Sequence, residues 1–128
     1  MNNQVTFPKA GLYAITPDDL LERRDNMDRL EAALKGGAKV VQFRHKRKSS
    51  KKSVHETAIK MQSMCKKFAT TFIINDDVEL ALKTDADGVH LGKNDSSYEN
   101  ARSVLGENKI IGVSCYNTLD NAIKASEK

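Results

Sequence analysis

The chain has 128 residues, which is enough for one domain with a buried core. Hydrophobic residues make up 39% and charged residues 30%, and no apolar run approaches membrane-spanning length, so the composition argues against a membrane protein. The two cysteines, Cys65 and Cys115, are too few for a disulfide framework or a zinc site, and no secretion signal is evident, so we expect a cytoplasmic protein with reduced thiols.

Strand and helix patterns alternate five times along the chain, beginning with a short strand over Leu12–Ile15. Thr16 and Pro17 end this strand, because the residue before a proline avoids helical geometry. Asp25 or Asn26 can cap the helix that follows. The pair Gly36-Gly37 ends this helix. Its apolar face consists of Met27, Leu30, Ala33 and Leu34.

The second strand, Lys39–Arg44, carries an unusual polar series at its carboxyl end. Alternate side chains share a face of a strand, so Val40, Gln42 and Arg44 point one way, whereas Val41 and Phe43 point the other way. Lys46 continues the series if the chain stays extended. Arginine offers a planar fork to phosphate oxygens and lysine a mobile point charge, so this face predicts a ligand cavity.

A basic run, His45–Lys52, accounts for much of the formal charge of +4. It fits a nucleic-acid patch, a solvated loop or a phosphate-binding loop. No aromatic residues for base stacking are interleaved, and the run directly follows a strand, so nucleic acid is the least favoured partner.

The second helix is expected to open with the capping-box pattern Ser53-x-x-Glu56. Its apolar stripe has spacings of four, three, four and three residues, which predicts core packing. The stripe consists of Val54, Ala58, Met61, Cys65 and Phe68.

The stretch 72–95 reads as strand, acidic turn, short helix, strand and acidic turn. A helical crossover makes its two strands, Phe72–Ile74 and Gly88–Leu91, parallel neighbours with adjacent carboxyl ends. Each end presents an acidic residue, and two such carboxylates repel unless a proton or a cation lies between them; Mg²⁺ fits this arrangement. In the alternative interpretation, Asp76 and Asp77 cap the short helix and Asp95 lies in a solvated turn. The apolar face of that helix is expected to be Val78, Ala81 and Leu82.

The remainder predicts a helix opened by Ser96-x-x-Glu99, a strand over Lys109–Val113, and a last helix starting at Asn117 or Thr118. Each strand then ends in polar residues at its carboxyl end, where ligands bind in parallel α/β folds. These residues are Gln42, Arg44, Lys46, Asn75, Asp76, His90, Asp95 and Ser114. A five-stranded doubly wound sheet and part of an eight-stranded barrel both fit the pattern.

Five consecutive blocks cover nearly the whole chain: GLYAIT, EAALKGGAKVVQFRHK, FIINDDVELAL, ADGVHLGKND and IIGVSCYN. In content, order and spacing they resemble the thiamine-phosphate synthase family. The resemblance implies a transferase with a TIM-barrel fold, which joins a pyrimidine diphosphate to a thiazole phosphate and releases pyrophosphate. It implies no catalytic acid–base pair or nucleophile, and it places residues 1–128 in the amino-terminal part of one barrel domain.

The resemblance also implies roles for individual residues. Gln42, Arg44, Lys46 and Asn75 would hold the pyrimidine diphosphate, Asp76 and Asp95 would bind Mg²⁺, Ser114 would reach the pyrophosphate, and Tyr13 and His90 would lie against the pyrimidine.

A sister family, the thiazole tautomerases, shares the barrel, but the two aspartates together with the Gln-x-Arg-x-Lys series favour the synthase. Lys93 and Tyr116 depart slightly from the synthase pattern, in which glutamine and histidine are usual.

Length is the larger departure, because synthases have roughly 200 residues or more and this chain ends after a fifth unit. About three strands, with the thiazole phosphate site, would be absent. We therefore expect an incomplete barrel that exposes its edges and self-associates or binds a complementing chain, either as a half-enzyme or as a binding module.

Overall fold

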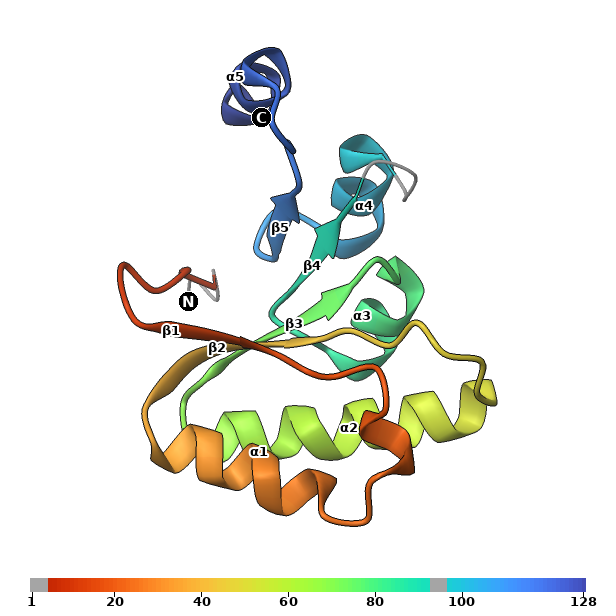
Figure 1. Ribbon diagram of the computed structural model, residues 1–128. Helices are drawn as coiled ribbons and strands as arrows, with labels where there is room; N and C mark the ends of the chain where they lie inside the picture. Colours follow the sequence, from red (N-terminus) through yellow and green to blue (C-terminus); the bar gives the residue numbers. More distant parts are fainter. Residues whose placement is uncertain (1–4, 93–96) are drawn as a thin grey trace.

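The computed structural model describes residues 5–92 and 97–128, and its five strands form one parallel sheet (Figure 1). All five predicted strands are confirmed, with bounds that differ by at most one residue. The elements are β1 (Leu12–Ile15), the short 3-10 helix η1 (Leu20–Glu22), α1 (Asn26–Lys35), β2 (Ala38–Phe43), α2 (Lys51–Lys67), β3 (Thr71–Asn75), α3 (Val78–Thr84), β4 (Gly88–Leu91), α4 (Tyr98–Leu105), β5 (Ile110–Val113) and α5 (Leu119–Ser126).

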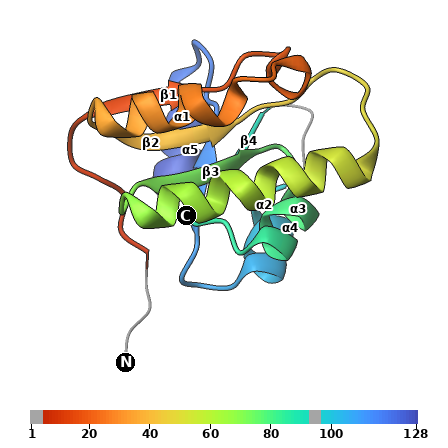
Figure 2. The same cartoon turned by 90° about the horizontal axis from the view of Figure 1, so that it is seen from below.

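The order of the strands decides between the two folds that the sequence left open. Each strand pairs in parallel with the next one along the chain, in the order β1-β2-β3-β4-β5. A doubly wound sheet reverses its strand order and carries helices on both faces, whereas α1 to α4 cover one face here (Figures 1 and 2). The fold is therefore α/β with the arrangement of consecutive units of a (β/α) barrel, open between β1 and β5 in the described part of the chain.

The core lies between the sheet and the helices. Alternate residues of the central strands point at the helices and are almost fully buried, and burying each such side chain contributes about 1.5–3 kcal/mol. The strand residues are Val41, Phe43, Phe72, Ile74, Val89 and Leu91; the helix residues that meet them include Leu30, Leu34, Ala58, Met61, Cys65 and Ala101. The predicted alternation in β2 and the predicted core stripe of α2 are confirmed.

The predicted capping residues of α2 and α4 are wrong, because in each helix a serine within one helical turn of the predicted one forms the cap. Ser50, not Ser53, caps α2: its backbone is extended and its hydroxyl accepts the backbone N–H of Ser53 at 3.1 Å. Ser97, not Ser96, caps α4 by accepting the backbone N–H of Asn100. Neighbouring serines are equivalent by residue type, so the backbone conformation of the preceding loop decides which of them caps.

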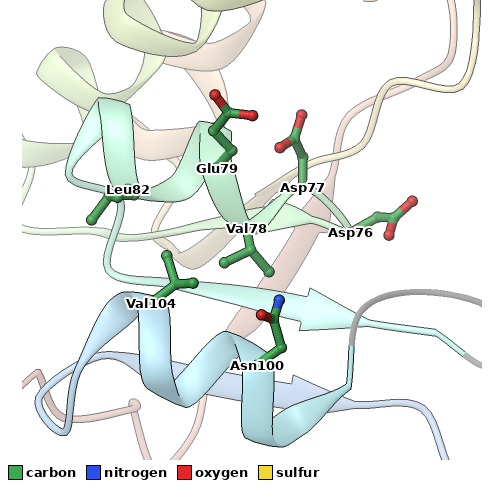
Figure 3. A pocket seen from close by; sticks show the side chains of 7 residues that line it. All are labelled: Asp76, Asp77, Val78, Glu79, Leu82, Asn100 and Val104. Carbon is green, nitrogen blue, oxygen red and sulfur yellow. The ribbon is translucent and has the colours of Figure 1, made fainter.

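The predicted apolar face of α3 is wrong at one position. Val78 and Ala81 are buried, but Leu82 is 53% exposed, and Leu80 and Thr84 are buried instead. The short α3 packs against α2, α4 and the sheet. Leu82 points toward a groove between α3 and α4 (Figure 3).

The two ends of the chain differ in how they contact the sheet. The backbone N–H of Val5 donates to the carbonyl of Asn108 at 3.0 Å, so the amino-terminal segment links the start of β1 to the start of β5. By contrast, α5 buries none of its residues, and among the helices in the described part of the chain it meets only α4, with which it lines a common cavity of about 320 Å³. No helix in the described ranges is long and apolar enough to cross a bilayer.

Candidate functional site

The candidate site lies at the carboxyl edge of the sheet, and its first component joins β1 to β2. Gln42 is only 4% exposed, and its Nε2 donates to the Tyr13 hydroxyl at 2.8 Å. Burial raises the pKa of the Tyr13 phenol, and the hydrogen bond from Gln42 opposes this rise. Tyr13 therefore stays neutral at physiological pH, with its O–H group able to donate to a ligand.

Arg44 follows β2 directly and is held by the loop after β1. The Thr16 hydroxyl accepts the backbone N–H of Arg44 at 2.9 Å and donates to the carbonyl of the same residue at 3.1 Å. The guanidinium contacts Asp18, with 3.0 Å between Nη1 and Oδ1. The Arg44 guanidinium therefore lies at the edge of the sheet, with its Nη1 already hydrogen-bonded to Asp18.

The two adjacent acids after β3 have different roles. Asp77 accepts the backbone N–H of Leu80 at 2.9 Å and caps α3, which confirms the capping interpretation for this residue. Asp76 has a left-handed φ of 71°, and its backbone N–H donates to the carbonyl of His90 at 2.8 Å. This backbone turn directs the two carboxylates apart, and Asp76 extends beyond the strand end (Figure 3).

Lys46 meets Asp76 across the edge, with 3.8 Å between Nζ and Oδ2. Because Asn75 is in register with His90, the end of β3 lies beside the fourth strand, as the sequence predicts. His90 in turn shares a 2.8 Å hydrogen bond with Ser114 through Nε2 and Oγ, which links β4 to β5. The structure thus brings together most of the candidate residues along neighbouring strand ends.

Asp95, the second candidate metal ligand, lies outside the described residues, as does Lys93. The carboxylate of Asp76 has the ammonium group of Lys46 beside it, so a positive charge already lies next to this candidate ligand. Mg²⁺ requires only one or two protein carboxylates when phosphate oxygens and water complete its shell, so this donor set fits the ion. The described residues contain no cluster of three or more metal-binding side chains.

The basic side chains of the run His45–Lys52 lie in three different environments. Lys46 faces Asp76, whereas Arg47 leaves the site and forms an ion pair with Glu22 at 2.7 Å. His45 faces a separate cavity of about 630 Å³ between α2 and α3, together with Lys51 and Lys52.

Thr16 and Asp18 are site residues that the sequence pattern did not identify. Thr16 reads as the end of a strand before a proline, and Asp18 as an ordinary loop acid. Their contacts with Arg44 span 28 and 26 residues, so only the pairing of β1 with β2 brings them into place.

Comparison with known proteins agrees with this architecture. A family model described as thiamine monophosphate synthase matches residues 12–128. The thiamine-phosphate synthase of Persephonella marina is 46% identical over 115 residues, which are 90% of this chain and 54% of that protein. The protein of the same name from Methylobacillus flagellatus is 47% identical over 119 residues, covering 93% of this chain and 56% of its own length.

A solved structure is also similar. Thiamine phosphate pyrophosphorylase from Pyrococcus furiosus superposes with a TM-score of 0.79 at 31% identity, over 91% of this chain and 55% of that chain. The chain therefore spans about half the length of the relatives that it matches.

Proposed function

The chain belongs to the thiamine monophosphate synthase family, and from this we propose that it carries the pyrimidine half of a thiamine-phosphate synthase active site. The observation that supports the proposal most directly is the convergence of Gln42, Arg44, Lys46, Asp76, His90 and Ser114 at the carboxyl ends of consecutive parallel strands. Ligands bind at this edge in β/α barrels.

In the proposed reaction, hydroxymethylpyrimidine diphosphate is coupled to a thiazole phosphate. The carbon–oxygen bond to the diphosphate breaks with both electrons leaving on pyrophosphate, and the thiazole nitrogen lone pair then forms the new carbon–nitrogen bond. Charge accumulates on the departing pyrophosphate, so fixed cations at that position lower the barrier. Arg44 and Lys46 supply this charge from the protein, and Mg²⁺ held by Asp76 and Asp95 would add to it.

The remaining residues orient the pyrimidine. Gln42 and Tyr13 are locked together by their hydrogen bond, and His90 and Ser114 by theirs, so each pair presents a fixed polar group to the ring or the diphosphate. Asn75 ends β3 at the same edge of the sheet, and there it would contact the same substrate. Such preorganisation is effective because the ligand does not have to order these side chains.

Completion of the barrel is part of the proposal. β1 and β5 are the edges of the described sheet, and α5 exposes Leu119 and Ile123, so further β/α units would pack against these surfaces to close a TIM barrel. Self-association or a complementing chain is one source of such units. The two free cysteines support a cytoplasmic location.

A coupling assay tests the proposal. Purified chain, both phosphorylated substrates and Mg²⁺ are combined, thiamine phosphate is measured, and the mass in solution is determined in parallel. Product from the chain alone would mean that association rebuilds a complete site.

The second candidate is a binding module that retains the pyrimidine diphosphate but does not couple it. It is favoured by the sheet that stays open between β1 and β5 in the described residues. Isothermal titration with the pyrimidine diphosphate, with and without Mg²⁺, separates the candidates: binding without product identifies the module, and absence of both contradicts the proposed site.

A further inference from the structure

We infer that Asp18, on the loop after β1, is a positioning residue that holds the Arg44 guanidinium in the orientation that receives a diphosphate. The inference rests on the proposed function, because it concerns the same anion site. Asp18 follows β1, whereas Arg44 follows β2, so the contact joins two neighbouring β/α units.

The backbone of Arg44 is fixed first. The pairing of β1 with β2 continues past both strands, because the backbone N–H of Thr16 donates to the carbonyl of Gln42 at 3.0 Å. The Thr16 hydroxyl then satisfies both backbone polar groups of Arg44. The backbone position of Arg44 is therefore fixed by its hydrogen bonds to Thr16, the residue that follows β1.

Asp18 then fixes the other end of the side chain. Its Oδ1 accepts from Nη1 of Arg44, and the described contacts of this guanidinium use no other nitrogen. Nε and Nη2 keep their donors for phosphate oxygens, which a guanidinium binds in a two-pronged manner. The Arg44 side chain is 42% exposed and that of Asp18 is 49% exposed, so an incoming anion reaches the pair.

Charge alone would predict the opposite role for Asp18. A carboxylate beside an anion site repels the anion, so its removal would tighten binding if orientation were unimportant. A positioning role instead predicts weaker binding after removal, because a long side chain must then be ordered by the ligand. The two roles therefore differ in the sign of one measurable effect.

The experiment measures binding of inorganic pyrophosphate to the full chain by isothermal titration without metal. Asp18→Ala is expected to weaken binding about threefold to fivefold, the usual range for an exposed ion pair. Asp18→Asn, which keeps a carbonyl acceptor, should lose less. Thr16→Val, which keeps the side-chain shape and removes both bonds to Arg44, should also weaken binding, and it provides a second test if Asp18→Ala folds poorly.

Asp19→Ala is the matched control. Asp19 is the adjacent acid on the same loop, but its carboxylate contacts Arg23 at 2.9 Å rather than Arg44. Its removal changes the charge equally and should not weaken pyrophosphate binding. In an Arg44→Ala background, Asp18→Ala should have no further effect on affinity.

Tighter or unchanged binding by Asp18→Ala would overturn the inference, as would an equal loss in the Arg44→Ala background. Absence of pyrophosphate binding by the unmodified chain would instead contradict the diphosphate site of the proposed function. The two failures are thus distinguished by the unmodified protein.

Discussion

The His90 ring lies so close to Gly112, its register partner on β5, that a Cβ atom at Gly112 would come within 2.7 Å of Nδ1. The glycine leaves space for the imidazole between the two strand ends, where Nε2 reaches Ser114. A small residue two positions before Ser114 is therefore part of the candidate site, although it carries no functional group.

Gly112→Ala is expected to displace the His90 ring and break its hydrogen bond to Ser114. Affinity for the pyrimidine diphosphate should fall roughly tenfold, corresponding to about 1.4 kcal/mol. Isothermal titration measures the change. Ser114→Ala removes the same hydrogen bond without a clash and should give a smaller loss of affinity. If Gly112→Ala binds the pyrimidine diphosphate as tightly as the unmodified chain, His90 does not contact the ligand.

Asp76→Ala is expected to abolish the Mg²⁺ dependence of pyrimidine diphosphate binding, because it removes the candidate metal ligand in the described part of the site. Asp77→Ala is the matched control, since this neighbour caps α3. The control should lower the free energy of unfolding by about 0.5–2 kcal/mol and keep the metal dependence. Titrations with and without Mg²⁺, together with urea denaturation, compare the variants, and a metal dependence that survives in Asp76→Ala would refute this assignment.

The two cysteines are expected to differ in reactivity. Burial raises the pKa of the Cys65 thiol to about 12, whereas Cys115 is partly accessible. At pH 8 an alkylating reagent should modify Cys115 and spare Cys65 in the folded chain, because the thiolate is the reactive form. Mass spectrometry with and without denaturant locates the adducts.

The same thiol makes stability depend on pH in a definite direction. Unfolding returns Cys65 to an ordinary pKa near 9.0, so the unfolded state loses its proton first. The contribution of this group is fully present below about pH 9 and is lost as the pH rises toward 12. Urea midpoints of a Cys65→Ala variant should fall less steeply above pH 9 than those of the unmodified chain.

The exposed face of α5 is expected to mediate association. Leu119 is 74% exposed and Ile123 is 48% exposed, and no residue of the helix is buried. Replacing both with lysine should reduce self-association, measured by light scattering, with little change in melting temperature. A marked drop in the melting temperature of the monomer would mean that this face packs within the chain.

Several features of this protein could be predicted from local sequence patterns. All five strands follow from short apolar runs that stop at polar turns, and the buried stripe of α2 follows from its helical spacing. Placement of Gln42, Arg44 and Lys46 at a strand end followed from alternation along β2. These features depend on neighbours within a few residues, which is the range over which backbone periodicity acts.

Tertiary structure decided the rest. The choice between a doubly wound sheet and a barrel arrangement depended on which strands pair, and the linear pattern is the same for both. The division between Asp76 and Asp77 depended on one left-handed residue, and the contacts of Arg44 with Thr16 and Asp18 depended on the pairing of β1 with β2. Composition and periodicity determined the elements and the kinds of side chain at their ends, but which of these groups meet is set by strand pairing between residues far apart in the chain.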